Sequence, residues 1–194
     1  MKIHLRHPFA AAAVLLLLLF FDGSGIFFGC FLAMLLHESS HTAVYSFLVK
    51  RPCEIEIGVG GIALLWREQD LRPSGRTLTL LAGPAANFIT ALICFACCKS
   101  RFRLFASVFG SVNLLLGAFN LLPLHFLDGG RLTTLLLHRF APVDLENKIL
   151  FTLQLLCLGL LTAAFLLYIT DLRSRIALLL FLSYFCCKSF CLKN

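Results

Sequence analysis

The chain has 194 residues, of which 59% are hydrophobic and only 14% are charged, with a formal net charge of +7. A soluble globular protein of this composition could not cover its surface with polar groups, so we predict an integral membrane protein. The positive charge does not indicate nucleic-acid binding, because Lys and Arg lie between apolar runs, as membrane anchors do.

Six apolar runs follow one another along the chain, at residues 8–21, 26–49, 78–98, 102–122, 149–169 and 176–187. Runs of this kind predict transmembrane helices. The first is preceded by Lys2 and Arg6 and lacks a small-residue cleavage pattern, so we interpret it as a retained helix rather than a signal peptide. The predicted fold is an all-α polytopic membrane protein with about six transmembrane helices in a single domain, residues 1–194.

The positions of Lys and Arg predict the orientation of these helices. With the N-terminus in the cytoplasm, twelve of the 17 Lys and Arg residues fall on the cytoplasmic side. Because cytoplasmic loops carry an excess of these residues, both termini are predicted to be cytoplasmic.

A segment between the second and third runs has a different period. Residues 54–57 alternate between Glu and Ile, and three glycines and a second apolar stretch follow before Trp66. This pattern predicts a β-hairpin with a glycine-rich turn. Either the hairpin dips into the membrane interface or it is an ordinary cytoplasmic hairpin, and the sequence leaves both open.

The second run contains the sequence HESSH at its centre. His37 and His41 are four residues apart, so on a helix their side chains project from one face and can reach one zinc ion. Glu38 lies next to the first histidine, where it can act as a general base. A single hydrogen-bonded buried histidine would explain one of these residues but not the set. Zinc in such a site makes water acidic enough to ionise near neutral pH.

A catalytic zinc site needs a third protein ligand. Asp128, in the stretch NLLPLHFLDGGRL, follows a predicted helix that runs in the same direction as the HESSH helix, so both can lie at similar depth. Gly129 and Gly130 would allow a close approach of the backbone. Alternatively, Asp128 is only a helix N-cap, and His125 is a rival ligand unless it extends to the interface.

Two further groups have open interpretations. Asn87, in LAGPAANF, is a polar residue in apolar surroundings that either joins two helices or offers hydrogen bonds to a substrate. Cysteine clusters at residues 94–98 and 186–191 either bind a second metal or pack as small apolar side chains. We favour packing for the cysteines, because no His or Asp lies nearby.

HESSH, GPAAN and NLLPLHFLDGG occur in this order on successive runs, and together they resemble the site-2 protease family of intramembrane zinc metalloproteases. The resemblance covers residues 26–138. It implies one zinc ion per chain, held by His37, His41 and Asp128, with Glu38 as the general base. It further implies that Asn87 and Asn120 position the substrate or the oxyanion, and that the membrane-associated hairpin holds an extended substrate.

The small size and six predicted helices are most similar to the sporulation-type branch, which processes pro-sigma factors. This resemblance implies a membrane protein substrate such as a tethered sigma factor, regulatory membrane proteins as partners, and a bacterial cell membrane. We expect no nucleotide-sensing (CBS) domain and no PDZ domain, and no nucleic-acid partner. Two rival functions are a membrane zinc carrier or sensor, against which Glu38 argues, and a non-catalytic protein that binds membrane clients.

Overall fold

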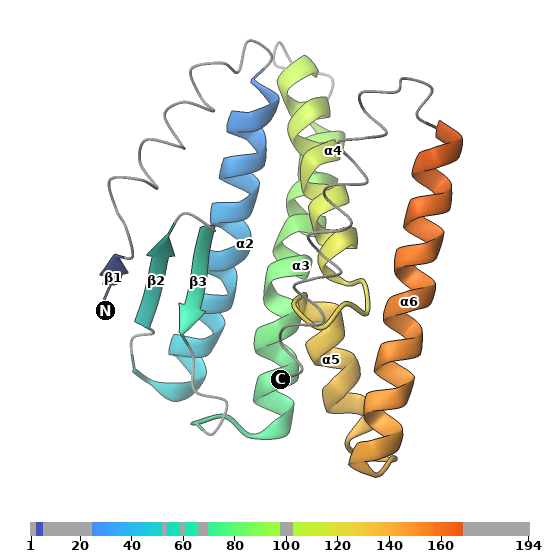
Figure 1. Cartoon of the computed structure of the whole chain (residues 1–194). Helices are drawn as coiled ribbons and strands as arrows, with labels where there is room; N and C mark the ends of the chain where they lie inside the picture. Colours follow the sequence, from blue (N-terminus) through green and yellow to red (C-terminus); the bar gives the residue numbers. More distant parts are fainter. Residues whose placement is uncertain are drawn as a thin grey trace. The chain divides into compact units, whose positions relative to one another are not determined.

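A computed structural model describes residues 3–5, 25–51, 54–58, 61–65, 70–97 and 103–168. The chain is mostly helical and divides into two compact units, residues 1–120 and residues 121–194. The predicted helices at residues 8–21 and 176–187 lie outside the described residues. The prediction of one protease domain remains a prediction, and the two units are described in turn (Figure 1).

Three helices form the main part of the first unit: α2 (Ile26–Val49), α3 (Pro73–Ala96) and α4 (Arg103–Asn120). They pack against one another in all three pairs. The bounds of α2 are those of the predicted run, and α4 nearly matches its run. Helix α3 begins before its apolar run because Pro73 occupies the first turn, where a missing backbone N–H costs nothing.

Both ends of α2 have left-handed backbone conformations that stop the helix. Gly25 precedes it with φ of 71°, and Lys50 follows it with φ of 57°. Such a conformation is common for glycine but unusual for lysine. The hydroxyl of Tyr45, in the last turns of α2, donates a hydrogen bond to Asp70 Oδ2 at 3.1 Å, and Tyr45 packs against Leu71. These contacts join the end of α2 to the start of α3.

Small residues allow the three helices to approach closely. The buried positions of α4 are Ala106, Gly110, Asn113 and Gly117. A methyl group at Gly110 would lie 3.0 Å from Cys94 Cβ, and one at Gly117 would lie 3.3 Å from Asn87 Cβ. Small residues serve the same purpose in membrane proteins, where helices gain contact area by close backbone approach.

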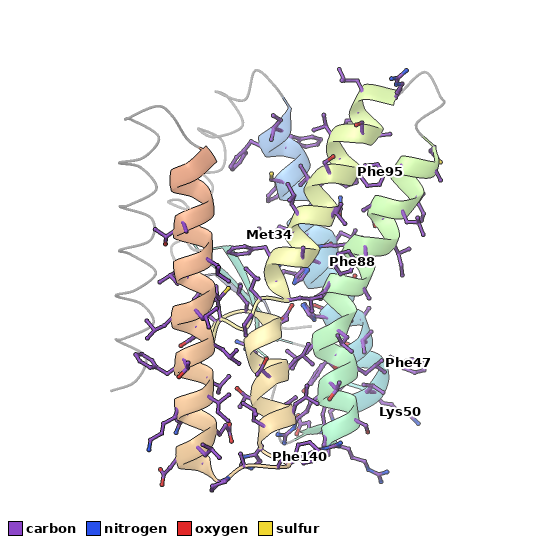
Figure 2. The ribbon with its side chains drawn as sticks, turned by 90° about the vertical axis from the view of Figure 1, so that its right-hand side faces the viewer. Met34, Phe47, Lys50, Phe88, Phe95 and Phe140 are labelled. Carbon is purple, nitrogen blue, oxygen red and sulfur yellow. The ribbon has the colours of Figure 1, made fainter. Side chains whose placement is uncertain are left out.

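Large apolar side chains point away from the packed interfaces. In the part of the chain that the structure describes, α3 and α4 are the two helices long and apolar enough to cross a membrane. Leu92 on α3 and Leu104 and Leu115 on α4 are largely exposed. Figure 2 shows side chains projecting outward from the helices, Phe47 at the end of α2 among them. In water these surfaces would be costly, whereas lipid accepts them.

Three strands complete the first unit: β1 (Ile3–Leu5), β2 (Glu54–Gly58) and β3 (Gly61–Leu65). They form a sheet in the order β1-β2-β3, in which β1 and β2 are parallel and β2 and β3 are antiparallel. The register of the antiparallel pair aligns Glu54 with Leu65 and Gly58 with Gly61. Strand β3 lies beside α2 (Figure 1). Association of this segment with the membrane remains a prediction.

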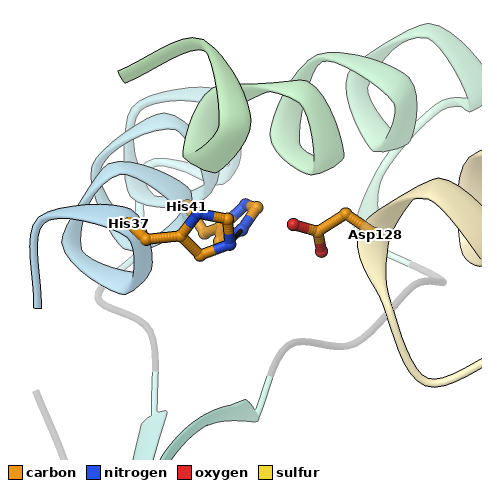
Figure 3. Close-up of side chains that lie close together, drawn as sticks. All are labelled: His37, His41 and Asp128. Atoms are coloured by element: carbon orange, nitrogen blue, oxygen red, sulfur yellow. Dashed lines mark hydrogen bonds between the residues drawn. The ribbon is translucent and has the colours of Figure 1, made fainter. Parts of the chain in front are cut away.

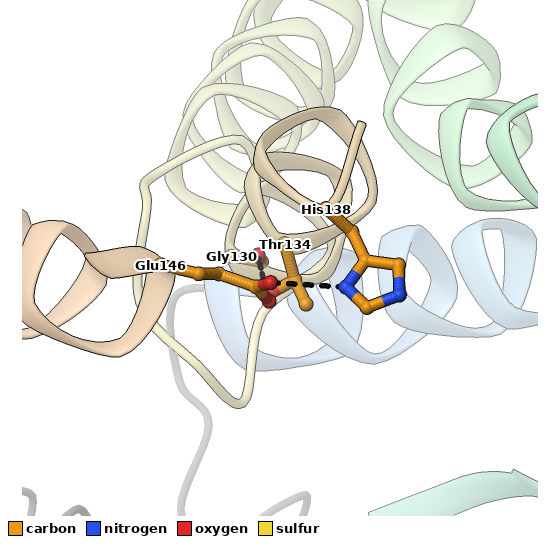
Figure 4. Close-up of polar contacts among 4 residues, drawn as sticks. All are labelled: Gly130, Thr134, His138 and Glu146. Atoms are coloured by element: carbon orange, nitrogen blue, oxygen red, sulfur yellow. Dashed lines mark hydrogen bonds and ion pairs between the residues drawn. The ribbon is translucent and has the colours of Figure 1, made fainter. Parts of the chain in front are cut away.

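The second unit contains α5 (Asp128–Leu137) and α6 (Val143–Tyr168). Helix α6 begins before the predicted run at 149, directly after Pro142. The two helices are joined by a contact of 3.1 Å between His138 Nδ1 and Glu146 Oε2, and Thr134 donates a hydrogen bond to the Gly130 carbonyl within α5 (Figure 4). Helix α5 was not predicted as a helix of its own, because its ten residues follow a Pro- and Gly-containing stretch with no long apolar run.

The start of α5 packs tightly against the preceding loop. A Cβ at Gly129 would overlap the carbonyl group of Leu121, and a Cβ at Gly130 would overlap that of Leu124. These neighbours are backbone atoms, which cannot move aside as a flexible side chain can. The close approach predicted for the two glycines is therefore present within this unit.

We expect Gly129→Ala to destabilise the protein by about 1–3 kcal/mol or more, because the added methyl group overlaps backbone atoms. Gly159→Ala on α6 is the control, since a Cβ there meets nothing within 4 Å. Alanine in a helix interior is favoured over glycine by roughly 0.5–1 kcal/mol, so the control should be neutral or stabilising. Thermal unfolding in one detergent, followed by circular dichroism, measures both. Equal unfolding temperatures for the two variants would contradict the tight packing at Gly129.

Candidate metal centre

His37 and His41 lie on the buried face of α2, on a stripe of residues spaced four apart. Their side chains are almost fully buried, and their Nε2 atoms face each other at 3.1 Å. The two rings are nearly perpendicular, with centroids 4.7 Å apart (Figure 3). As predicted from their i, i+4 spacing, the two imidazoles lie together on one face of α2.

The Nδ1 atom of each imidazole contacts helix α3. His41 Nδ1 lies 2.7 Å from the Thr79 carbonyl oxygen, and His37 Nδ1 lies 3.1 Å from Asn87 Nδ2. Because a carbonyl oxygen only accepts, His41 donates from Nδ1, and in the neutral ring its Nε2 carries a lone pair. Metal-binding histidines are held in this way, with the second nitrogen bonded to a backbone or side-chain partner.

Glu38 follows His37 directly and is half-buried. The two serines after it are bonded to their own helix, since Ser39 and Ser40 both donate to the Leu36 carbonyl, at 2.9 and 2.7 Å. Such bonds to the preceding turn are common for serine within helices. Ser39 and Ser40 are therefore paired within α2, and their presence in an apolar helix needs no further partner.

Gly83 lies against both imidazoles on the buried face of α3. A Cβ at this position would overlap His41 Nε2 and would lie 2.8 Å from His37 Nε2. The next residue is Pro84, also buried, so the helix presents little side-chain volume to the histidines. The absence of a side chain at Gly83 of the GPAAN motif thus allows both imidazoles to approach α3 closely. Any larger residue at this position would displace the rings.

The two asparagines predicted to contact substrate have different surroundings. Asn87 has no exposed surface, and its Nδ2 atom contacts His37. Asn120 is the last residue of α4, and its Nδ2 donates to the Leu116 carbonyl at 3.1 Å. The predicted roles of both in positioning substrate or oxyanion remain predictions.

Asp128 belongs to the second unit and is the first residue of α5, following Leu127 as N-cap. It is therefore not the N-cap itself, which was the alternative interpretation of this residue. A carboxylate in the first turn of a helix is favoured by the partial positive charge of the unpaired backbone N–H groups. His125, the rival ligand, is exposed in the turn before α5.

The histidine pair fits a tetrahedral zinc ion. Two nitrogens that each lie about 2.0–2.1 Å from one tetrahedral zinc stand roughly 3.3 Å apart. The observed separation of 3.1 Å between His37 Nε2 and His41 Nε2 is close to this value. Imidazole nitrogen and carboxylate oxygen are also the donors that catalytic zinc sites use. The pair therefore suits a zinc ion both in its spacing and in its chemistry.

Comparison with known proteins gives a family match and a structural likeness. Residues 96–161, about a third of the chain, match the model of the family described as Peptidase family M50. The fold is similar to that of a site-2 protease. The structure of the Site-2 Protease from Methanocaldococcus jannaschii is 21% identical to this chain, with a TM-score of 0.60 over 94% of this chain and 86% of that one. The search of curated proteins gives no match.

The matched family region contains Asn120 and Asp128. It begins at residue 96, so it does not include the HESSH motif at residues 37–41. Thr79, whose carbonyl oxygen contacts His41, was not among the predicted site residues. The signal for it was the four-residue spacing from Thr79 through Gly83 to Asn87, which places all three on one face of α3.

We expect Gly83→Ala to lower the affinity for Zn²⁺ or Co²⁺ at least about tenfold, because the methyl group displaces the imidazoles that must converge on the ion. The matched control is Gly29→Ala on α2, where a Cβ would meet only Phe109 at an ordinary 3.8 Å. Cobalt titration followed by visible absorbance measures the affinity of purified protein. Wild-type affinity in Gly83→Ala would show that the two rings do not need the glycine surface to bind metal.

Proposed function

We propose that this chain is an intramembrane zinc endopeptidase of the site-2 protease family. His37, His41 and Asp128 hold one zinc ion, and Glu38 is the general base. The observation that carries the proposal is the buried histidine pair with facing Nε2 atoms. It is supported by the fit of the two imidazoles to a tetrahedral zinc ion and by the match of residues 96–161, which include Asp128, to a peptidase family.

The protein is proposed to lie in a bacterial cell membrane, with both termini in the cytoplasm. Support comes from the two apolar helices α3 and α4 and from the distribution of Lys and Arg along the sequence. Ionisable groups within membrane helices are costly and are usually retained for a function. The buried His37 and His41, set among apolar helices, fit this expectation.

Proteolysis requires that each residue of the site perform a separate task. A zinc ion at the three ligands supplies a Lewis acid that polarises a carbonyl group and makes water more acidic. The carboxylate of Glu38 accepts the proton of the attacking water and later donates it to the leaving amine. The Thr79 carbonyl holds the His41 ring in the tautomer whose Nε2 lone pair faces the site. Asn120 is proposed to stabilise the oxyanion, for which its amide must leave the Leu116 carbonyl.

The substrate is proposed to be a membrane-associated protein bound in an extended form. Strand β3 is an edge strand in the order β1-β2-β3, and it lies beside the helix that carries the histidines. Adding a strand to a sheet edge unwinds a helical substrate and exposes its peptide bonds. The resemblance to the sporulation-type branch extends this proposal to a membrane-tethered sigma factor, with regulatory membrane proteins as further partners.

We expect Glu38→Gln to retain zinc and to lose cleavage by at least about a hundredfold, because glutamine keeps the shape of the side chain but accepts no proton. The control is Asp144→Asn, which removes an exposed carboxylate in the first turn of α6. Membrane proteomes of cells that express wild type, Glu38→Gln or Asp144→Asn are compared. The expected result is a membrane protein that is shortened by wild type and Asp144→Asn but not by Glu38→Gln.

Zinc analysis and transport assays separate this proposal from its rivals. A wild-type protein that holds zinc and shortens no membrane protein would indicate a non-catalytic client-binding protein. Uptake of zinc into sealed vesicles that contain the purified protein would indicate a carrier. Native cleavage by the Glu38→Gln variant would contradict the assigned general base.

A further inference from the structure

Positively charged side chains gather where α2 ends and α3 begins. Lys50 and Arg51 directly follow α2, and Arg72 directly precedes α3. All three are exposed, and in the part of the chain that the structure describes none of them forms an ion pair. Like charges that lie close together repel one another, so this basic cluster of Lys50, Arg51 and Arg72 is favoured when an anion binds to it.

Contacts between the two helices bring the members of the basic cluster to one place. The hydroxyl of Tyr45 donates a hydrogen bond to Asp70, and the ring of Tyr45 packs against Leu71. Gly75 of α3 lies close to Leu48 of α2, since a Cβ added at Gly75 would be 3.6 Å from Leu48 Cδ1. The last turn of α2 thus lies against the first turn of α3. The cations that follow one turn and precede the other therefore lie beside each other.

A further cation belongs to the same end of the helix pair. Arg76 lies in the first turn of α3, and its Nε donates a hydrogen bond to the Leu71 carbonyl at 3.3 Å. The carboxylate of Asp70 lies here too, and it accepts the hydrogen bond from Tyr45. Among the side chains that the structure describes at this end, positive charge is therefore in excess.

Exposed apolar side chains border the basic cluster. Phe47 on α2 is 81% exposed and Leu78 on α3 is 54% exposed. Figure 2 shows the side chains of Phe47 and Lys50 projecting from the same end of α2. A free phosphate ion would meet only the cations, whereas a phospholipid offers a phosphate to the cations and acyl chains to the apolar side chains. The combination therefore favours a lipid over a free anion.

We propose that the joined ends of α2 and α3 bind the headgroup of an anionic phospholipid. Lys50, Arg51 and Arg72 contact its phosphate, and Phe47 and Leu78 contact its acyl chains. Clusters of Lys and Arg next to the cytoplasmic ends of membrane helices attract anionic lipids, which the cytoplasmic leaflet carries. This inference rests on the proposed membrane location and orientation of the chain, and it does not depend on the zinc site.

A bound headgroup stabilises the packing of α2 on α3. It lies between cations of both helices, so it offsets their mutual repulsion. The same two helices carry His41 and the Thr79 carbonyl that contacts it, so the lipid supports the helix pair on which the histidines depend. A ligand that binds the folded chain and not the unfolded chain raises the unfolding temperature. An anionic lipid should therefore stabilise this protein more than a zwitterionic lipid does.

The experiment compares lipids on the purified full chain in detergent. Phosphatidylglycerol is the anionic probe and phosphatidylcholine the zwitterionic one, and native mass spectrometry measures the affinity for each. Each cation near an anionic lipid surface contributes about a fivefold factor in binding. The triple variant Lys50→Gln, Arg51→Gln, Arg72→Gln should therefore bind phosphatidylglycerol roughly a hundredfold more weakly at low ionic strength.

Two control variants separate a lipid site from a general effect of charge. Arg131→Gln, Arg139→Gln and Lys148→Gln together remove three exposed cations of the second unit and should leave the affinity at its wild-type value. The second control exchanges Lys for Arg and Arg for Lys at the three positions of the basic cluster. It keeps every charge and should retain the wild-type affinity.

A measurement on wild type does not depend on the folding of any variant. Phosphatidylglycerol at roughly a hundred times its Kd should raise the unfolding temperature by about 5–10 °C, and phosphatidylcholine should not. About 0.5 M NaCl should abolish most of this shift, because salt screens the exposed cations.

Several results would overturn the inference. They are equal losses of affinity in the two glutamine variants, wild-type affinity in the variant of the basic cluster, and equal stabilisation by both lipids. The same shift from inorganic phosphate or glycerol phosphate would overturn the lipid and indicate a site for a free anion. Failure of wild type to bind zinc would refute the proposed protease but not this inference. A chain that stays soluble without detergent would refute the membrane location and this inference with it.

Discussion

The hydrogen bond between His41 Nδ1 and the Thr79 carbonyl is the interaction on which the site depends. It crosses from α2 to α3, and because a carbonyl oxygen only accepts, it places a proton on His41 Nδ1. With that proton on Nδ1, the neutral His41 ring has its lone pair on Nε2, the atom that lies 3.1 Å from His37 Nε2. The packing of α2 on α3 therefore leaves Nε2 of His41, rather than Nδ1, as the nitrogen that can bind a metal.

Close helix packing and site geometry depend on the same small residues. Gly83 lies against the imidazoles, and Gly117 lies against the backbone of Pro84 and the side chain of Asn87. A larger residue at either position would separate two helices and at the same time move a polar group of the site. In a membrane, where apolar side chains gain little from leaving lipid, such close contacts and interhelical hydrogen bonds are the main sources of association. Here the contacts of His37 and His41 with α3 join two of the helices.

Local features of the sequence predicted the helices best. Helix α2 matches its predicted bounds because a glycine and a Lys-Arg-Pro sequence enclose one apolar run, and the spacing of His37 and His41 placed them on one face. The short helix α5 and strand β1 carry too few residues for a periodic signal. The contact between His37 and Asn87 joins residues fifty positions apart, and no local pattern in the sequence can reveal such a contact.

Two independent lines of observation converge on the proposed zinc site. The family match covers residues 96–161, which include Asp128 but neither histidine. The hydrogen bonds of His37 and His41 are made with each other and with α3. All the residues in these bonds precede residue 96, where the family match begins. A buried pair of imidazoles with both Nδ1 atoms in polar contacts would be an expensive way to join two helices, since apolar side chains between the helices would carry no polar cost. This free-energy cost can be offset if the two Nε2 atoms bind a partner that attracts them more strongly than they attract each other. A divalent cation is such a partner.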